Sequence, residues 1–595
     1  MNSLKAEESG LRERLALAGA VALAAIVACY FAAPYYVGVY GDDTCYLMMA
    51  WSIFGGGECP YCHLTLDNPY SRGWPAALTL FNLFFGDTPS SYRLVSGIYS
   101  VLAAVLFADL CARRSGKLTG GLFALALVTT FGWSQLATVL MTEPYYLLLI
   151  TLSLWVWGRC DETSTADSVV LGLTSSLAIS TRSEGLILLL ALAICLVLRR
   201  RWKPLAIFLA SAAVCYGVFQ LLIPPPSSPH GSQVLSFFDG RISLADLVKV
   251  WFLNQSVLVG QVFVGGKAWQ GQVLGLLFLA AAVDNLVRTP RLRTWPGTWL
   301  IAGLAAVLLV WPYIAFRYWF GLMPCWLYLL LMDRPEKLQR AVLGALAAVQ
   351  LLLLLRGMPG DPSRHYRQLE ELYTGAGQLS QKDLVAATYP CNVHAYSHRN
   401  GIPVPASQTP GAFAFKIQQA GANAVVLERR LNTIVSVDGG RQSGPPLRAD
   451  LWLERCPFFE PVYSSEVGVV ARLSVTPEAL AESVKLWRQA QTVTEPRERL
   501  RLVENALQQT PDFPELMLLR FIWAHQEGSA STEDLTKQAR HYAELYPHDF
   551  QSGLTFLAIL SERGAREPVV EIAESFRKEA ERLGDARAVE AFRPR

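Results

Sequence analysis

Long uncharged apolar runs between residues 15 and 356 constrain the fold of this chain more than any other feature of its sequence. Hydrophobic residues make up 52% of the chain and charged residues only 17%, and the apolar excess is concentrated in this segment. Apolar runs of about 20 residues are long enough to cross a bilayer as helices. Residues 357–595 have the mixed composition of a soluble protein. We therefore expect a membrane domain followed by soluble domains.

Eleven segments are candidates for transmembrane helices. They lie at residues 15–39, 92–112, 118–138, 144–158, 168–182, 184–198, 204–223, 270–287, 296–315, 318–332 and 341–355. The first follows Lys5, Arg12 and Arg14 and is long enough to span, so we expect a retained helix rather than a cleaved signal peptide. The pattern predicts a polytopic α-helical membrane domain of about eleven helices over residues 1–356.

The distribution of basic residues predicts the orientation of this domain. If the N-terminus is cytoplasmic, the loops on the cytoplasmic side carry more than twice as many lysines and arginines as the loops on the other side. Cytoplasmic loops are enriched in these residues. We therefore expect a multi-pass protein of the inner (plasma) membrane whose C-terminal part is extracytoplasmic, that is, periplasmic.

Two soluble domains are expected after the membrane domain. In residues 357–476, "DLVAATYP", "GANAVVLE" and "VGVVARLSV" have the pattern of short strands, and "GAFAFKIQQA" that of a helix, which predicts a small α/β domain. Residues 477–595 are helical in pattern, and "TPDFPELMLLRF" at 510 recurs as "YPHDFQSGLTFL" at 546. This spacing is similar to that of tetratricopeptide (TPR) hairpins, so the helical region is a candidate site for a protein partner.

Charged residues gather at the predicted outer ends of the membrane helices. They are Asp42 and Asp43, Glu143, Arg182 with Glu184, and Arg317. Each has a structural explanation, because an aspartate can cap a helix, a glutamate can favour a first turn, and Arg182 can pair locally with Glu184. Charges at membrane depth are nevertheless costly, and their grouping at one end indicates a functional site.

The chemistry of these residues is complementary. A carboxylate at a water-filled mouth can take a proton from an acceptor or hold a divalent cation. An arginine binds phosphate through two parallel donors. Because a phosphate at membrane depth is most naturally a lipid headgroup, the residues predict group transfer from a lipid phosphate to an extracytoplasmic acceptor.

The order of short motifs resembles a known superfamily. "DDTCY", "DNPYSRGWP", "LFFG", "SYRLVSGIYSVL", "MTEPYYLLL", "STRSEGLILLL" and "RYWFGLMP" follow one another over residues 10–335. This order is similar to that of the GT-C polytopic glycosyltransferases, in particular the group that contains bacterial protein O-mannosyltransferases and lipid A aminoarabinose transferases. The resemblance implies transfer of a sugar from a polyprenyl-phosphate carrier, with inversion at the anomeric carbon.

The resemblance also implies roles for individual residues. Asp42 matches the catalytic base, with Asp43 beside it, and because the family often has Asp-Glu here, the Asp-Asp pair leaves open which aspartate is the base. Glu143 matches an assisting acidic residue. Asp43 and Glu143 are therefore candidate ligands of a divalent cation such as Mg²⁺ or Mn²⁺.

The same resemblance implies a phosphate site. Arg182 and Arg317 match basic positions near the carrier phosphate. Arg93 is a further candidate, although it could simply anchor the second span.

The motif "CPYCH" at residues 59–63 has two interpretations. A CxxC pair followed by histidine can belong to a redox or zinc site, but no second CxxC accompanies it. A local disulfide, or a bond from one of these cysteines to Cys45, is the preferred interpretation in an oxidising compartment. Cys391 and Cys456 could also pair within the α/β domain.

Two other functions remain open at this stage. A non-catalytic membrane scaffold for envelope polysaccharide assembly would use the helical tail, and a lipid-linked sugar transporter would use the charged cavity. A transporter is expected to have internal repeats among its helices, which this sequence lacks. A nucleic-acid partner is excluded, since the net charge is only +3 and no basic cluster is interleaved with aromatic residues on a soluble face.

Overall fold

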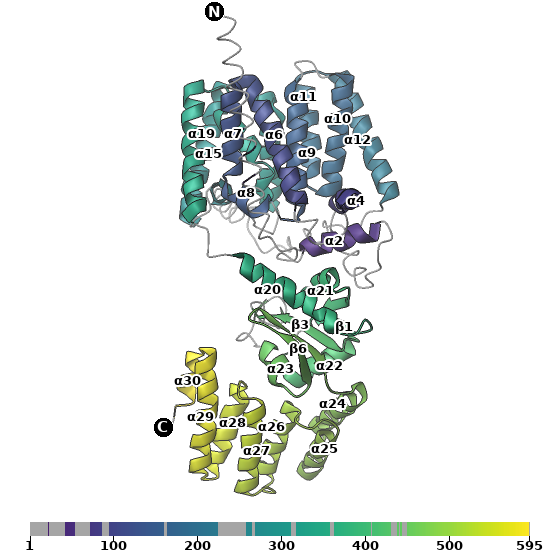
Figure 1. The fold of residues 1–595 in the computed structure, drawn as a ribbon, viewed down its shortest axis with the longest axis vertical. Coiled ribbons are helices and arrows are strands. Elements are labelled where there is room, and N and C mark those ends of the chain that lie inside the picture. Colours follow the sequence, from purple (N-terminus) through teal and green to yellow (C-terminus); the bar gives the residue numbers. More distant parts are fainter. Residues whose placement is uncertain are drawn as a thin grey trace, which may run out of the picture. The chain divides into compact units, whose positions relative to one another are not determined.

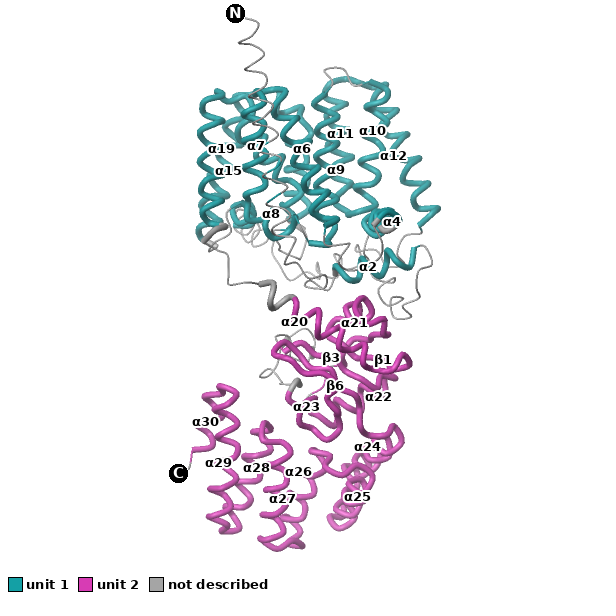
Figure 2. The backbone as a smooth tube through the Cα atoms, in the orientation of Figure 1, with its two compact units in different colours: residues 1–366 teal, residues 367–595 magenta. Residues whose placement is uncertain are grey.

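The chain forms two compact units in the computed structural model. Unit 1 comprises Met1–Tyr366 and unit 2 comprises Arg367–Arg595, shown in teal and magenta in Figure 2. The structure describes residues 42–53, 72–85, 94–137, 139–159, 164–223, 257–263, 268–310, 317–356, 362–405, 407, 409–429, 437–438, 441–442 and 449–593, with positions 19, 22 and 26.

Unit 1 is a bundle of helices that run side by side (Figure 1). Its described helices in chain order are α2 (Asp42–Ile53), α4 (Gly73–Phe85), α6 (Val95–Ser115), α7 (Lys117–Val128), α8 (Phe131–Leu136), α9 (Thr142–Arg159), α10 (Thr165–Thr181), α11 (Gly185–Leu198), α12 (Trp202–Leu222), α15 (Ala268–Arg288), the 3₁₀ helix η1 (Pro290–Thr294), α16 (Pro296–Val310), α17 (Arg317–Phe320), α18 (Met323–Leu331) and α19 (Glu336–Arg356).

Three of the described helices have the length and apolar composition needed to cross a membrane: α6, α12 and residues Trp269–Arg288 of α15. Some of their apolar side chains are exposed and do not pack inside the bundle. On α12, for example, Leu221 and Leu222 are 85% and 76% exposed. Exposed apolar surface of this extent needs a lipid environment, which supports a membrane location for unit 1. The prediction of about eleven spans extends over residues outside the described ones and stays a prediction.

Two predicted spans are wrong as single helices. The segment 118–138 forms α7 and α8, because Thr130 adopts an extended backbone and its Oγ1 caps α8 by accepting from the Trp133 amide at 3.2 Å. The segment 318–332 forms α17 and α18, with Pro324 in the first turn of α18. Proline is compatible with a first turn but not with a helix interior, so the helix begins anew there.

Helices α2 and α4 lie at one end of the bundle, with α2 running across it (Figure 1). The Thr79 hydroxyl of α4 donates to the Ala50 carbonyl of α2 at 3.0 Å. At the start of α4, a Cβ on Gly73 would lie 2.6 Å from the carbonyl carbon of Ser180, so only glycine permits this contact with α10. Farther along α4, Leu80, Leu83 and Phe84 are exposed.

Unit 2 begins with a mixed sheet. The strands are β1 (Leu384–Ala387), β2 (Asn400–Pro403), β3 (Ala424–Glu428), β6 (Phe459–Ser464) and β7 (Gly468–Leu473), in the order β2-β1-β3-β7-β6, and a separate pair is formed by β4 (Val437–Asp438) and β5 (Arg441–Gln442). β1 pairs in parallel with β2 and β3, while β7 is antiparallel to β3 and β6. The helices of this part are α20 (Pro362–Gly375), η2 (Ala376–Gln378), α21 (Pro390–Ser397), α22 (Pro410–Gln419) and α23 (Ala449–Arg455).

The elements predicted from the sequence are present in this sheet. The three predicted strand segments contain β1, β3 and β7, and the predicted helix is α22. Strands β2 and β6 were not predicted. The disulfide between Cys391 and Cys456 that the sequence allowed is not formed, and the Cys456 sulfur lies 3.7 Å from the Tyr546 hydroxyl.

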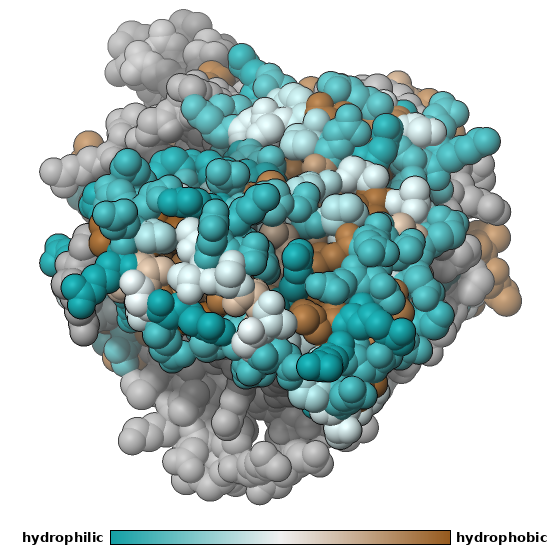
Figure 3. All heavy atoms as spheres, turned by 90° about the horizontal axis from the view of Figure 1, so that it is seen from below, coloured by the Kyte–Doolittle hydropathy of each residue, from teal (hydrophilic) through white to brown (hydrophobic). Residues whose placement is uncertain are grey.

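Seven helices follow the sheet in unit 2. They are α24 (Pro477–Thr492), α25 (Pro496–Gln509), α26 (Pro514–Gln526), α27 (Thr532–Leu545), α28 (Phe550–Glu562), α29 (Arg566–Leu583) and α30 (Ala586–Ala591), here called the helical tail. Hydrophilic residues cover most of the face that Figure 3 shows, with small apolar areas between them. This is the surface expected of a part outside the membrane; the assignment of the helical tail to the TPR class stays a prediction.

Candidate functional site

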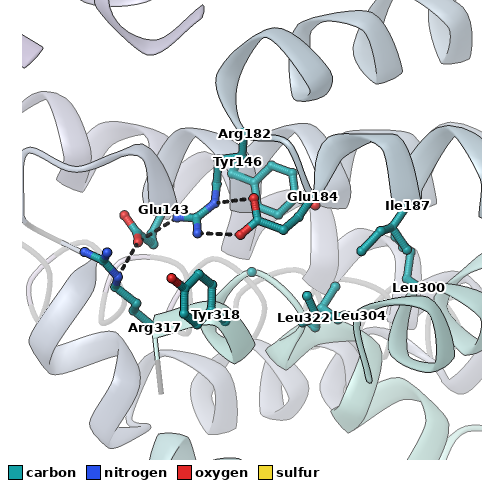
Figure 4. Close-up of a pocket in the computed structure, with 11 residues that line it drawn as sticks. Glu143, Tyr146, Arg182, Glu184, Ile187, Leu300, Leu304, Arg317, Tyr318 and Leu322 are labelled. Carbon is teal, nitrogen blue, oxygen red and sulfur yellow. Dashed lines mark hydrogen bonds and ion pairs between the residues drawn. The ribbon is translucent and has the colours of Figure 1, made fainter. Parts of the chain in front are cut away.

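Four charged residues predicted from the sequence to lie near one another line a single pocket in unit 1 (Figure 4). Glu143 is in the first turn of α9, Arg182 follows α10, Glu184 precedes α11, and Arg317 begins α17. The turn between α10 and α11 is tight because Gly185 approaches the backbone of Ala178, where a Cβ would lie 2.2 Å from the carbonyl carbon. The pocket therefore lies where α9 and α11 begin and α10 ends.

Arg182 lies between the two glutamates and binds both. Its Nη2 donates to Glu184 Oε1 at 2.8 Å and its Nε to Glu184 Oε2 at 3.4 Å, so the carboxylate is bound in a bidentate way. Its Nη1 donates to Glu143 Oε1 at 2.7 Å and to Thr142 Oγ1 at 3.0 Å. The guanidinium of Arg182 is only 11% exposed, and all three of its nitrogens are already engaged.

Glu143 connects the two arginines of the pocket. It is 2% exposed, and its Oε1 lies 2.7 Å from Arg182 Nη1 and 3.9 Å from Arg317 Nε. Its Oε2 accepts from the Thr142 hydroxyl at 3.2 Å. A buried carboxylate is stable only when paired and hydrogen-bonded, which Glu143 is.

Arg317 is the more accessible arginine of the pocket. Its side chain is 36% exposed, about three times as much as that of Arg182. Its guanidinium carbon lies 5.7 Å from the centre of the Tyr318 ring, which also lies 5.5 Å from Arg182. Both guanidinium groups thus lie within cation–π distance of the Tyr318 ring, a contact that stabilises cations.

The remaining wall of the pocket is apolar. Ile187 of α11, Leu300 and Leu304 of α16, and Leu322 line it beside the charged residues (Figure 4). Apolar neighbours keep the local dielectric constant low, so the charges act more strongly on one another and on a ligand than they would in water. The pocket combines an apolar side, suited to a lipid or to the nonpolar face of a sugar, with a charged side.

Helix α2 begins with the two first-loop aspartates, Asp42 and Asp43. Tyr46 of α2 is buried, and Asp43, three residues earlier, is on the same face of the helix. The Asp43 side chain is buried, and its Oδ1 accepts from the Thr44 amide at 3.0 Å.

Three predicted sites cannot be placed. Asp42 is the first residue of α2, but its side chain is outside the described part of the structure. Arg93 and the cysteines of "CPYCH" also lie outside the described residues. The roles of Asp42, Asp43 and Arg93 therefore stay predictions.

Arg72 was not singled out from the sequence. It lies directly before Gly73 in the chain. Gly73 approaches the backbone of Ser180 and Thr181, the two residues that precede Arg182. Its Nε is buried and has no hydrogen-bond partner among the described residues. A buried guanidinium nitrogen without a partner among the described residues is a costly feature that a bound anion would relieve. In the sequence, this arginine stands in "YSRGWP", five residues after Asp67, and nothing in that motif indicates that it is buried.

The pocket does not fit a divalent cation at Glu143. The Oε1 of this residue faces two guanidinium groups, whose positive charge opposes a metal ion, and Glu184 is bound to Arg182 in the same way. Within the described residues, no three His, Cys, Asp or Glu side chains group as metal ligands. We therefore derive no step through a metal ion.

No protein-family model matches the chain, and no curated protein matches its sequence. Solved structures with a similar fold include ArnT from Cupriavidus metallidurans in the apo state, with 13% identity, a TM-score of 0.49, and coverage of 76% of this chain and 96% of that chain. The same protein bound to undecaprenyl phosphate gives 14% identity, a TM-score of 0.42, and coverage of 76% and 97%. The Archaeoglobus fulgidus oligosaccharyltransferase in complex with Zn and sulfate gives 14% identity, a TM-score of 0.45, and coverage of 85% of each chain.

ArnT and the oligosaccharyltransferase are both glycosyltransferases of the GT-C superfamily, the one that the sequence motifs resemble. Likenesses at this level of identity carry no statement about substrate or mechanism. The function proposed below therefore rests on the chain's own pocket.

Proposed function

We propose that this protein is a membrane glycosyltransferase that moves a sugar from a polyprenyl-phosphate carrier to an acceptor outside the cytoplasm. The observation that carries the proposal is the pocket itself: two arginines and two glutamates beside an apolar wall, at one end of a bundle with lipid-facing helices. A ligand that satisfies both sides of this pocket has an anionic group joined to an apolar chain.

The accessible arginine is the natural contact for the carrier phosphate. Arg317 is exposed enough to be reached from the mouth of the pocket, and guanidinium groups bind phosphate with charge-assisted hydrogen bonds. Arg182, whose nitrogens are engaged by Glu143 and Glu184, orients these carboxylates instead of binding the ligand directly.

The transfer step is a single displacement. The acceptor hydroxyl or amine attacks the anomeric carbon, the bond from that carbon to the phosphate oxygen breaks, and its electron pair leaves on the carrier phosphate. The proton of the acceptor passes to a carboxylate of α2, for which we propose Asp42, with Asp43 beside it. The products are the glycosylated acceptor, with inverted configuration, and the free polyprenyl phosphate.

Substitution in the full-length protein tests the two halves of this proposal. Asp42→Asn and Asp43→Asn are made singly, and sugar release from a polyprenyl-phosphate carrier is measured; loss of the base is expected to slow release by about 10²- to 10⁴-fold. Arg317→Ala is expected to raise the Kd for the carrier by about tenfold or more, since a charge-assisted hydrogen bond contributes roughly 1.5–3 kcal/mol.

Two control variants lie at the other end of the same unit. Asp109→Asn and Arg340→Ala each remove a charge from an exposed ion pair, with Arg113 and with Glu336 respectively, and are expected to leave release and binding unchanged. If both aspartate variants keep the parent rate, the base is not on α2. If Arg317→Ala binds the carrier as the parent does, the phosphate assignment is wrong.

A further inference from the structure

Among the described residues that line the pocket, the charges sum to zero. Arg182 and Arg317 contribute two positive charges, and Glu143 and Glu184 contribute two negative ones. A site built only to hold phosphate would be expected to carry a positive excess. The second glutamate is therefore the feature that needs an explanation.

Among the described residues, Arg182 is the one cation that Glu184 binds. Its two oxygens receive Arg182 Nη2 and Nε, and Oε2 also accepts from the exposed Ser183 hydroxyl at 3.2 Å. Arg182 would still be paired through Glu143 and Thr142 if Glu184 were neutral. The carboxylate of Glu184 thus cancels one positive charge next to the proposed phosphate contact, Arg317, without being needed to bury Arg182.

The two forms of the carrier differ in charge. In the donor, the phosphate is a diester with one negative charge, whereas the spent carrier is a monoester whose second ionisation occurs near pH 6, so that it is mostly a dianion at neutral pH. A positively charged pocket would bind the dianion more tightly than the donor and would be inhibited by its own product. A balanced pocket does not favour the dianion.

We propose that Glu184 sets the charge balance of the pocket so that the spent polyprenyl phosphate is not held more tightly than the sugar-bearing donor. This inference rests on the proposed function. Glu184 acts through the electrostatic field of the pocket and through Arg182, so it is a residue that determines affinity and product release and takes no part in the transfer step.

The test is a comparison of two affinities in the full-length protein in detergent. The probes are a short-chain polyprenyl phosphate and the same chain in phosphodiester linkage to a sugar, both at pH 7.5. Glu184→Gln leaves a positive excess, and the variant is expected to bind the monoester roughly tenfold more tightly than the parent does. Because the electrostatic free energy scales with ligand charge, the affinity for the singly charged diester is expected to rise by only about threefold. Inhibition by added polyprenyl phosphate is expected to become stronger in parallel.

A second variant adds a negative charge where Glu184→Gln removes one, and it does so at an exposed residue. Ser183 is exposed, and Ser183→Asp adds a negative charge beside Glu184, so the monoester is expected to bind more weakly and the diester to change less. A protein that is merely damaged would lose affinity for both ligands in both variants. Glu336→Gln, in an exposed ion pair with Arg340 at the other end of the unit, is the matched control and is expected to bind both ligands as the parent does.

The results separate this inference from the proposed function. If the parent binds the polyprenyl phosphate saturably but Glu184→Gln leaves the monoester-to-diester ratio unchanged or weakens the monoester, the role of Glu184 is wrong and the glycosyltransferase proposal stands. If the parent shows no saturable binding of either ligand, the proposed function fails, and the inference fails with it.

Discussion

Glu143 is the residue through which the charges of the pocket are connected. It is 2% exposed, and both arginines of the pocket approach the same oxygen, Oε1. An ionised carboxylate in such a position is maintained only while its partners are present, since breaking a buried ion pair leaves an uncompensated charge. The stability of unit 1 and the geometry of its pocket therefore depend on the same contacts.

Arg182→Ala is expected to destabilise unit 1 strongly. The variant leaves the carboxylates of Glu143 and Glu184 with much less compensation, and losses of about 3–5 kcal/mol are typical when one partner of a buried pair is removed. Thermal unfolding of the full-length protein in detergent measures the effect. Arg340→Ala removes an exposed pair with Glu336 and is expected to cost less than about 1 kcal/mol. Equal melting temperatures for the two variants would contradict the importance of the Arg182 contacts.

At the scale of single residues, the sequence predicts which charges gather but not what each of them touches. Glu143, Arg182 and Arg317 could be grouped because each is at the same predicted end of a helix. The bidentate contact of Arg182 with Glu184 depends on the backbone of the α10–α11 turn, which the sequence pattern does not specify. Arg72 was missed because its distinguishing property, a buried nitrogen without a partner, exists only in the folded chain.

At the scale of secondary-structure elements, the contact between α4 and α10 links the first-loop helices to the segment that carries Arg182. Gly73 of α4 lies against the backbone of Ser180 and Thr181, and α4 in turn holds α2 through the Thr79–Ala50 hydrogen bond. The elements that carry Asp43 and Arg182 are thus linked by one close approach of two backbones.

Gly73→Val is expected to separate α4 from α10. A Cβ would lie 2.6 Å from backbone atoms of Ser180, and backbone atoms cannot move aside as a flexible side chain can. We expect faster hydrogen exchange in α4 and α2 and a loss of sugar release. Gly97→Ala in α6 is the matched control, since its Cβ would meet nothing within 4 Å and alanine favours a helix by about 1 kcal/mol. Normal exchange in α4 of Gly73→Val would show that this contact is not needed.

The sequence predicts where the helices of unit 1 lie better than it predicts where they are interrupted. Apolar runs place α6, α9, α10, α11 and α12 within a few residues of the predicted spans. The break between α7 and α8 lies at "TTFGWSQ", whose few polar residues are compatible with a continuous span, and the break between α17 and α18 lies at "FGLMP". They depend on a threonine cap and on a proline, signals that are weak beside the length of the surrounding apolar sequence.

At the scale of the whole molecule, each unit has its own buried charged contacts. In unit 2, Glu515 of α26 joins the helical tail to the α/β part, because its Oε1 accepts from the amides of Gly411 and Ala412 at the start of α22, both at 3.1 Å. Arg455 of α23 pairs with Glu579 of α29 at 2.8 Å. The sheet and the helical tail are therefore parts of one folded unit, which their separate sequence patterns do not indicate.

Glu515→Gln is expected to be at least as stable as the parent at pH 7. Burial raises the pKa of Glu515, so the folded state binds a proton more readily than the unfolded state, and the stability from this group is lost as the pH rises through the raised pKa. Glutamine keeps the acceptor oxygen without the buried charge. The difference in the free energy of unfolding between Glu515→Gln and the parent is expected to decrease as the pH falls toward the ordinary glutamate pKa of about 4.3.

Hydrogen exchange in α22 and thermal unfolding at several pH values measure this effect. Glu515→Ala is the contrasting variant, since it leaves the Gly411 and Ala412 amides without their acceptor and is expected to cost about 1–3 kcal/mol. A Gln variant that is less stable than the parent at pH 7, by as much as the Ala variant, would show that the negative charge itself is needed at the start of α22.

The pocket is assembled from residues that leave the ribosome at different times. Glu143, Arg182 and Glu184 are made well before Arg317, so during synthesis the first three form a group with one excess negative charge. Membrane segments are delivered in chain order, and domains generally fold from the N-terminus as they are made. Arg182 already compensates much of that charge, so Glu143 and Glu184 can be inserted as a group in which one arginine is shared. Arg317 then completes the balance, and the site becomes neutral only when the helices on both sides of it have entered the membrane.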